Sequence, residues 1–135
     1  NEVTDQIIAA AIKVHRHFGP RLFEQVYKTC LYRELQRRSL VVAKEVVLPA
    51  VYEGELLDCG YRIDLLVECS VIVELKAVEQ VTELHRMQLL TYLRLARKQV
   101  GLLLNFKAIH LRSGIVRVVN GYEGPAPSVS SAAPR

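Results

Sequence analysis

The chain has 135 residues, half of them hydrophobic, a length and composition that suit one globular domain with a single core. Its formal charge of +4 is compatible with a polyanionic partner but is also common in proteins that bind none. No apolar run approaches the roughly 18 residues that cross a bilayer, and the amphipathic start lacks the layout of a signal peptide. We therefore expect a cytoplasmic protein with no membrane partner. The three cysteines, spaced neither as a disulfide framework nor as a zinc site, are expected to be reduced and structural: Cys30, Cys59 and Cys69.

Two helices are predicted in the first 38 residues. Thr4 is the expected N-cap of the first helix, whose apolar residues keep a helical spacing until Gly19-Pro20 ends it. In the second helix, apolar residues recur at three- and four-residue intervals from Phe23 to Leu35. The basic residues lie mostly outside this stripe and should form its outer side: Lys28, Arg33, Arg37 and Arg38.

From Val41 the pattern changes to β-branched and alternating residues, which predicts a meander of antiparallel strands with a turn at Glu53-Gly54. These strands cover residues 41–48 and 51–52, then 56–67, then 71–77. A helical period returns over residues 79–98, and two closing strands are predicted at 100–106 and 115–119.

The predicted order of elements is therefore α-α-β-β-β-α-β-β, in the α/β or α+β class, with helices flanking a central sheet. From about residue 123 the sequence consists largely of Gly, Pro, Ser and Ala. This composition predicts a flexible tail over residues 123–135, after a single domain over residues 1–122.

The stretch from Cys59 to Lys76 reads as a hairpin, because two apolar runs flank a short polar break at residues 68–70. If that break is a three-residue loop, the antiparallel register places Asp64 directly opposite Glu74. Opposed side chains in such a ladder have Cβ atoms roughly 4.5 to 5.5 Å apart, a distance at which two carboxylates repel unless a cation compensates.

Lys76 shares the face of Glu74, since side chains alternate along a strand, and the intervening carbonyl of Leu75 could join the carboxylates as an oxygen ligand. Hard cations such as Mg²⁺ or Mn²⁺ prefer such ligands, and the chemistry suited to them is phosphodiester hydrolysis. The alternative is that Glu74 and Lys76 are ordinary strand residues, with Asp64 paired to Arg62 or Lys76.

The helix predicted after this hairpin carries polar groups within an apolar stripe. Gln88 and Tyr92 lie on that stripe, and a buried amide needs hydrogen bonds, so a site at the sheet edge is one destination for Gln88 and a backbone partner is the other. The stripe consists of His85, Gln88, Leu89, Tyr92, Leu93 and Ala96. A second apolar set could be covered by a partner subunit: Leu84, Met87 and Leu95.

Two residues of the N-terminal helices are weaker candidates. Glu24 lies in the first turn of the second helix, where a carboxylate suits the helix dipole, but it could also reach the same metal from the neighbouring layer. His15 is expected to be a packed helix residue, because nothing near it completes a metal site.

Asp64, then Glu74-Leu75-Lys76, then Gln88-x-x-x-Tyr92 together resemble the PD-(D/E)XK nuclease superfamily, in particular its RecB-like branch. Over about residues 7–121 the chain also resembles the small GxxExxY proteins. The matching segments are residues 14–27, 60–64, 73–77, 88–93 and 101–106. One position departs from the pattern, since Arg21 stands where the naming motif has glycine.

This resemblance implies a restriction-endonuclease-like core with a mixed sheet, and roles for particular residues. It implies metal binding by Asp64 and Glu74, assistance from Lys76 and a contribution from Glu24. It also implies substrate-binding or site-shaping roles for two residues of the third helix: Gln88 and Tyr92.

The first functional hypothesis is a Mg²⁺- or Mn²⁺-dependent nuclease acting on DNA with low sequence specificity. Its phosphate contacts would come from Lys28, Arg37, Arg38, Arg94, Arg97 and Lys98. The second is a catalytically silent module that keeps the nuclease fold for nucleic-acid binding or protein assembly. So small a domain encloses little of a duplex, which favours a homodimer or a larger assembly.

Overall fold

The computed structural model describes residues 1–121, so the predicted tail at 123–135 lies outside the described residues. The elements are α1 (Glu2–Phe18), α2 (Glu24–Arg37), β1 (Val42–Tyr52), β2 (Glu55–Val67), β3 (Val71–Lys76), α3 (Glu83–Ala96), β4 (Val100–Asn105), η1 (Leu111–Gly114) and β5 (Ile115–Val119). The strands form one sheet in chain order, in which β3 and β4 are parallel and the other neighbours are antiparallel. The predicted order of elements and the mixed sheet are confirmed.

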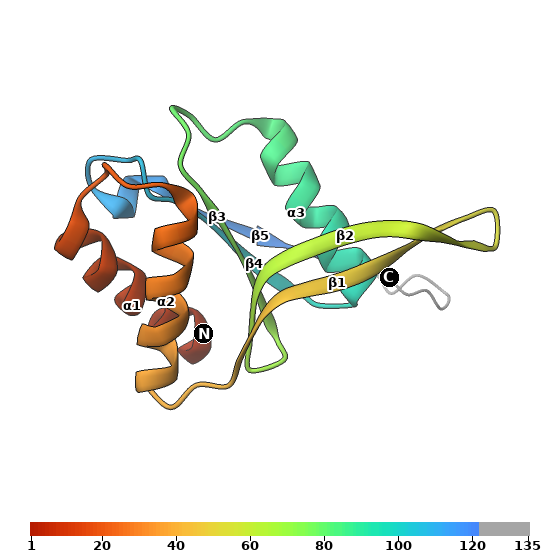
Figure 1. The fold of residues 1–135 in the computed structure, drawn as a ribbon, viewed down its shortest axis with the longest axis horizontal. Coiled ribbons are helices and arrows are strands. Elements are labelled where there is room, and N and C mark those ends of the chain that lie inside the picture. The colour runs from red at the N-terminus through yellow and green to blue at the C-terminus, as the bar shows by residue number, and fades with distance from the viewer. Residues whose placement is uncertain (122–135) are drawn as a thin grey trace.

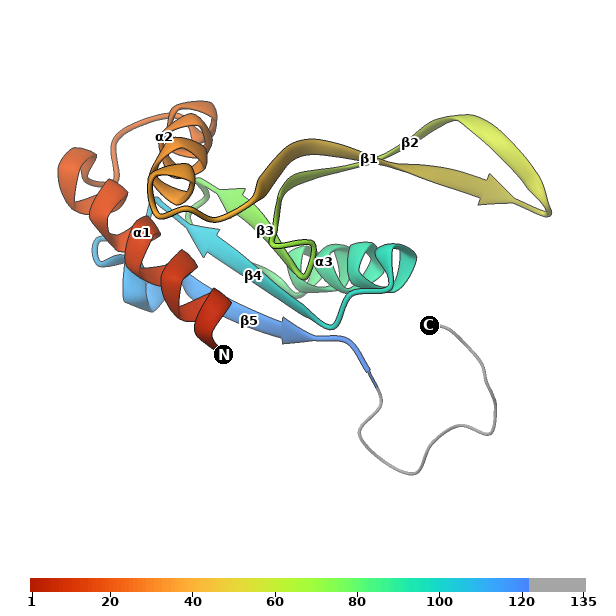
Figure 2. The same cartoon turned by 90° about the horizontal axis from the view of Figure 1, so that it is seen from below.

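Helices cover both faces of the sheet, as Figures 1 and 2 show. α1 and α2 cover one face, where Leu31 and Tyr27 pack with Leu65 and Leu75 in the larger core. α3 covers the other face and packs Leu89 with its neighbours in a smaller core. Alternation along β3 and β4 supplies both cores, because successive side chains of a strand point to opposite faces.

Two helices begin elsewhere than predicted: the cap of α1 was misassigned, and no cap was predicted for α3. Asn1, not Thr4, caps α1: its side chain accepts from the Thr4 amide at 2.8 Å, and the Thr4 hydroxyl oxygen accepts from the Asn1 amino group at 3.0 Å. Thr82 caps α3 in the same reciprocal way, so this helix begins four residues later than residue 79. Arg97 adopts a left-handed conformation with φ of 59° and ends it.

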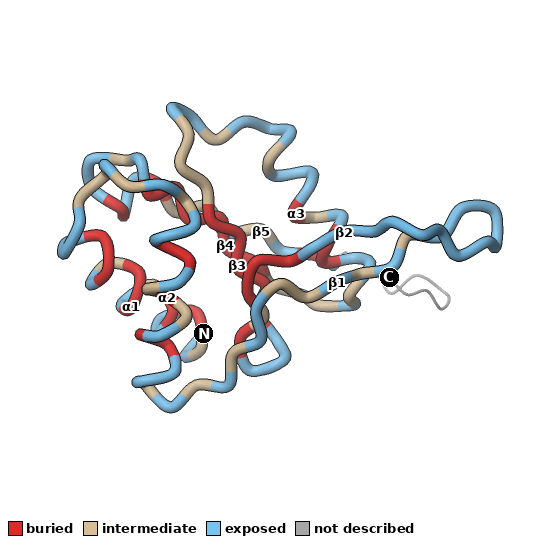
Figure 3. Tube along the Cα trace, viewed as in Figure 1, coloured by how far each residue is buried: buried red, intermediate tan, exposed pale blue. Residues whose placement is uncertain are grey.

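The hairpin of β1 and β2 extends well beyond the rest of the sheet (Figures 1 and 2). We call residues 51–62 the arm, and each of them is exposed (Figure 3). β1 continues through Pro49, where a break was predicted; an edge strand tolerates proline, and the register shifts between Pro49 and Val51. Cys59 lies on the arm.

The three cysteines are free thiols, as predicted, but two of them do not pack in the core. Cys59 and Cys69 are exposed, one on the arm and one in the β2–β3 turn, while Cys30 is half-buried on α2. Among the helices of residues 1–121, none combines the length and the apolar character needed to cross a bilayer.

Glu34 of α2 is a buried acid whose charge is matched by two cations. It accepts from Lys13 Nζ and from Arg38 Nε, each at 3.2 Å. Burial alone would raise the pKa of Glu34, but the hydrogen bonds from Lys13 and Arg38 outweigh it and hold the pKa below 4.5.

Because its folded-state pKa is depressed, Glu34 stabilises the fold above its unfolded-state pKa, and this contribution is lost as the pH falls through the folded-state pKa. We therefore expect the Glu34→Gln variant to be less stable than the wild type at neutral pH and to lose less stability on acidification. Urea unfolding at a series of pH values from neutral to below 4.5 would measure this. Parallel curves for the two proteins would contradict it.

Candidate active site

The hairpin of β2 and β3 has the register that the sequence predicts. Val67 pairs with Val71 and Leu65 pairs with Val73, around a turn in which Glu68 and Cys69 both have positive φ. The next pair away from the turn would be Asp64 with Glu74. At this pair, hydrogen bonds between a side chain and the facing backbone replace the bonds between the two backbones.

The two acids exchange hydrogen bonds with the facing strand. The Asp64 amide donates to Glu74 Oε2 at 2.8 Å, and the Leu75 amide donates to Asp64 Oδ2 at 2.9 Å. Both acids are buried, with Asp64 9% and Glu74 6% exposed. The side chains of two adjacent strands thus bring two carboxylates together inside the fold, as the sequence predicted.

β2 is irregular around Asp64. A regular strand sends residues two apart to the same face, yet Ile63 packs in the core under α3 and Leu65 in the core under α1 and α2. In the facing strand Glu45 has a φ of 54°, and the β1–β2 pairing skips it between Lys44 and Val46. The strand therefore rotates at Asp64, which lets this carboxylate reach toward α2.

The cation that pairs with Asp64 is Lys28 of α2, at 3.2 Å from Oδ1. Neither Arg62 nor Lys76, the partners considered from the sequence, forms an ion pair with Asp64. Lys28 is 8% exposed and also donates to Glu45, so its placement on the outer, phosphate-binding side of α2 was wrong. Lys28 and Glu45 are the site residues that sequence reasoning missed.

One signal could have located Lys28. It follows Glu24 by four residues, and residues four apart share one side of a helix. Because Glu24 was expected to reach the metal site, Lys28 could have been expected on the same side of the helix. Glu45 had no such signal, because its position depends on a left-handed backbone in an otherwise extended strand.

Glu74 lies in an environment that disfavours its negative charge. Burial, and then the nearby charge of Asp64, raise the pKa of Glu74 to about 8, although the Asp64 amide and the Lys76 ammonium act in the opposite direction. A carboxylate held so near a second one accommodates a positive ion readily.

Glu24, the first residue of α2, belongs to the same electrostatic group. Burial raises the pKa of Glu24, and so does the charge of Asp64, while Lys76 and Lys28 lower it. The loop that leads to Glu24 is fixed by Tyr27, whose hydroxyl accepts from the Leu22 amide at 3.0 Å and donates to the Gly19 carbonyl. The structure thus brings Glu24 to the side of the site formed by α2.

α3 supplies the opposite side. Lys76 Nζ donates to Gln88 Oε1 at 3.4 Å, but Gln88 is exposed, so the expectation that it lies buried in an apolar stripe was wrong. Tyr92 is 7% exposed, and burial followed by the charge of Glu74 raises the pKa of Tyr92. His85 does not reach the site, because its Nδ1 accepts from the Thr82 amide at 3.0 Å at the start of the helix.

The carboxylate of Glu24 interacts electrostatically with those of Asp64 and Glu74, and carboxylates suit a hard divalent cation better than a soft one. Within residues 1–121, no three or more His, Cys, Asp or Glu side chains form a group able to hold a metal ion by themselves. Metal binding would therefore need Asp64 and Glu74 to be joined by the Leu75 carbonyl or by solvent, with Glu24 at the side.

Comparison with known protein families agrees with this geometry. The family model described as the PD-(D/E)XK nuclease superfamily matches residues 1–118, which include every described element except the last residue of β5. No curated protein and no solved structure gives a significant match to the chain. Because the family model covers far more than half of the sequence, the chain belongs to the PD-(D/E)XK nuclease superfamily.

Proposed function

We propose that the protein is a Mg²⁺- or Mn²⁺-dependent nuclease that hydrolyses phosphodiester bonds in DNA with low sequence specificity. The observation that carries the proposal is the contact between two buried acids on adjacent strands, Asp64 and Glu74, with Lys76 two residues beyond Glu74. Membership of the nuclease superfamily supports a nucleic-acid substrate.

The ion would be held by the carboxylates of Asp64 and Glu74, with the Leu75 carbonyl and Glu24 as further donors. Once bound, it would supply a Lewis acid that lowers the pKa of a water molecule and offsets the charge of the phosphate. The buried position of the two acids keeps bulk water from screening their charge, which strengthens their hold on a cation.

Lys76 would stabilise the negative charge that develops on the phosphate, because its ammonium lies at the end of β3 next to the acids. Gln88 accepts a hydrogen bond from this ammonium and would keep it aimed along the site. The charge of Glu74 raises the pKa of Tyr92, so the two side chains are near each other, and Tyr92 would close the side of the site under α3.

The proposal of low sequence specificity is supported by the exposed basic residues. Of the phosphate contacts expected from the sequence, Arg37, Arg94 and Arg97 are exposed, whereas Arg38 is engaged by Glu34. Scattered exposed arginines bind the backbone of nucleic acid and carry little sequence information.

The assignment to a branch and a family within the superfamily rests on the segments of this sequence that resemble GxxExxY proteins. We propose a GxxExxY protein of the RecB-like branch, with its domain over residues 1–122 and a cytoplasmic location. A homodimer is supported by the large apolar side chains that α3 exposes: Leu84, Met87 and Leu95.

The test is cleavage of labelled single- and double-stranded DNA and RNA with Mg²⁺, with Mn²⁺ and with a chelator. We expect metal-dependent cutting by the wild type and a loss of roughly 10²-fold or more in the Asp64→Asn variant, because one anionic donor is removed. Circular dichroism would establish that the variant folds. Metal-independent cutting, or full activity in Asp64→Asn, would overturn the proposed mechanism.

One observation favours a second candidate, a catalytically silent module that binds nucleic acid. Lys28 already supplies a positive charge at Asp64, as a bound cation would. If that ion pair persists in solution at millimolar Mg²⁺, no cleavage should be seen on any of the substrates, while binding to nucleic acid should survive both metal removal and the Asp64→Asn substitution.

A further inference from the structure

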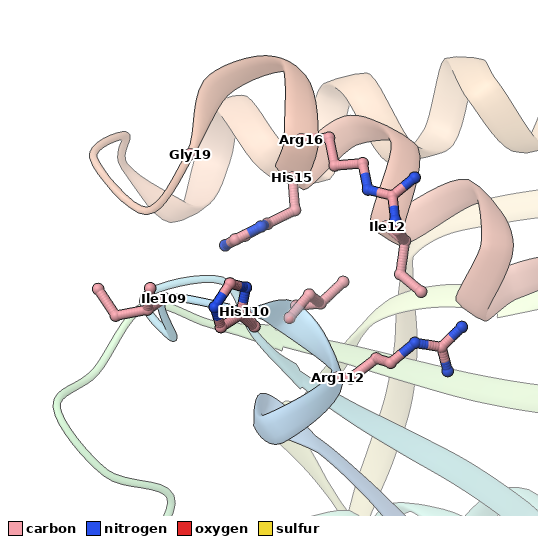
Figure 4. Close-up of a pocket in the computed structure, with 8 residues that line it drawn as sticks. Ile12, His15, Arg16, Gly19, Ile109, His110 and Arg112 are labelled. Atoms are coloured by element: carbon pink, nitrogen blue, oxygen red, sulfur yellow. The ribbon is translucent and has the colours of Figure 1, made fainter.

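Two cavities are lined by adjoining segments of the chain. The first, of about 620 Å³, is formed by residues 20–25 together with Ala77 and Lys107. The second, of about 400 Å³, lies between the end of α1 and the segment that leads into η1 (Figure 4). No residue lines both, but Gly19 of the second cavity precedes Pro20 of the first, and Lys107 of the first lies two residues before Ile109 of the second.

The first cavity adjoins the candidate site through Glu24. Glu24 forms part of its wall, and Ala77 follows Lys76 in the chain. It also contains two cations, Arg21 and Lys107. Lys107 pairs with Glu79 at 3.0 Å, but both side chains are largely exposed, and a phosphate can compete with a surface ion pair of this kind.

Phe23 is one of the residues that line this cavity, and it is 84% exposed. A single exposed apolar residue is ordinary, but this one lines a cavity with two cations and directly precedes Glu24 of the candidate site. An aromatic face in such a position can stack on a nucleobase of any identity. A base inside a duplex is already stacked and paired, so an exposed ring in the wall of this cavity suits an unpaired strand.

The second cavity is cationic as well. Its walls carry Arg16 and His15 from α1, and His110 and Arg112 from the opposite side, and none of the described residues that line it is an acid (Figure 4). Both arginines are exposed and free to reach phosphates. His15 Nε2 bonds to the Ala108 carbonyl at 2.8 Å, which ties the two walls together.

We propose that the two cavities form a path for single-stranded nucleic acid leading away from the site. One base stacks on Phe23, its neighbouring phosphates contact Arg21 and Lys107, and the strand continues to Arg16 and Arg112. The path deepens the proposed nuclease function and rests on it for the direction of the strand.

The decisive measurement is binding of labelled single-stranded and duplex oligonucleotides, followed by fluorescence anisotropy at several salt concentrations in the Lys76→Ala background, which keeps the probe intact. The double variant Arg16→Glu/Arg112→Glu should weaken single-strand binding roughly ten-fold or more and reduce the slope of log K against log salt by about 0.7 for each phosphate that is no longer neutralised. Arg33→Glu on α2 combined with Arg86→Glu on α3 makes the same charge change at two exposed residues that line neither cavity, and it should have little effect.

The Phe23→Ala substitution separates base stacking from charge. It should weaken single-strand binding roughly ten-fold and leave duplex binding unchanged, while Phe23→Trp should restore the affinity. Equal losses in the control pair, no binding by the parent protein, or no effect of Phe23→Ala would each overturn the path. If the protein with Lys76 intact binds single strands through the path but cuts none of the substrates, the nuclease proposal is overturned and the path stands. If that protein cuts DNA and the path variants have unchanged Michaelis constants, the path is overturned and the nuclease proposal stands.

Discussion

Replacing Lys76 with alanine is expected to lower the rate of DNA cleavage by roughly 10²- to 10³-fold while leaving the protein folded. The side chain lies half-buried at the end of β3, outside both apolar cores, and its ammonium contacts only exposed Gln88 among the hydrogen bonds of the described residues. Its removal therefore deletes a positive charge beside Glu74 without opening a cavity. Single-turnover cleavage at saturating metal would measure the effect on the chemical step.

Two further variants test whether the loss of cleavage is specific to residue 76. Lys13→Ala removes a lysine of α1 that pairs with Glu34 and not with the candidate site, and this variant should cut at the wild-type rate. Gln88→Leu should have a smaller effect than Lys76→Ala, since it leaves the ammonium in place and removes only its partner. A Lys76→Ala protein as active as the wild type would exclude an electrostatic role for this residue.

Replacing Lys28 with methionine is expected to destabilise the metal-free fold by roughly 3 to 5 kcal/mol. The substitution keeps most of the side-chain volume but leaves Asp64 and Glu45 without the cation that they share. Asp64 is buried beside Glu74, so its charge would keep the hydrogen bond from the Leu75 amide but lose its ion-pair partner. Urea unfolding in the presence of a chelator would measure the loss.

Glu45→Gln is the matched control, because it removes one acid and leaves the pair of Lys28 with Asp64 intact; it should cost less. Manganese should restore part of the stability of Lys28→Met, by about 2.7 kcal/mol at a concentration one hundred times the dissociation constant. If Lys28→Met unfolded at the wild-type urea concentration without metal, the ion pair would contribute nothing to the fold.

Local features of the sequence were enough to predict the core of the site. The short polar break at residues 68–70 sets the register of β2 against β3, and alternation then sets the face of each side chain. Asp64 and Glu74 could be brought together from these two rules alone. The periodicity of apolar residues, helical in three segments and alternating in others, predicted three helices and five strands within a few residues of their observed ends.

The contacts that could not be predicted depend on groups far apart in the chain. Lys28 reaches Asp64 because β2 rotates where Glu45 takes a left-handed conformation, and a strand pattern gives no sign of such a change. Gln88 sits at the edge of the buried stripe of α3, so a small rotation of the helix decides its exposure. The sequence could not decide between Asn1 and Thr4 as the cap of α1, because either side chain can accept from a backbone amide. The choice depends on the residue at which the helix begins.

The exposed arm of β1 and β2 has a practical consequence. The tip of the arm lies apart from the helices (Figures 1 and 2). Cys59, in the β2 part of the arm, is an exposed thiol. With Cys69 changed to serine, a maleimide dye would attach chiefly to Cys59, since Cys30 is half-buried. A fluorophore at this site would detect a second macromolecule approaching the arm while leaving the acids of the sheet chemically unmodified.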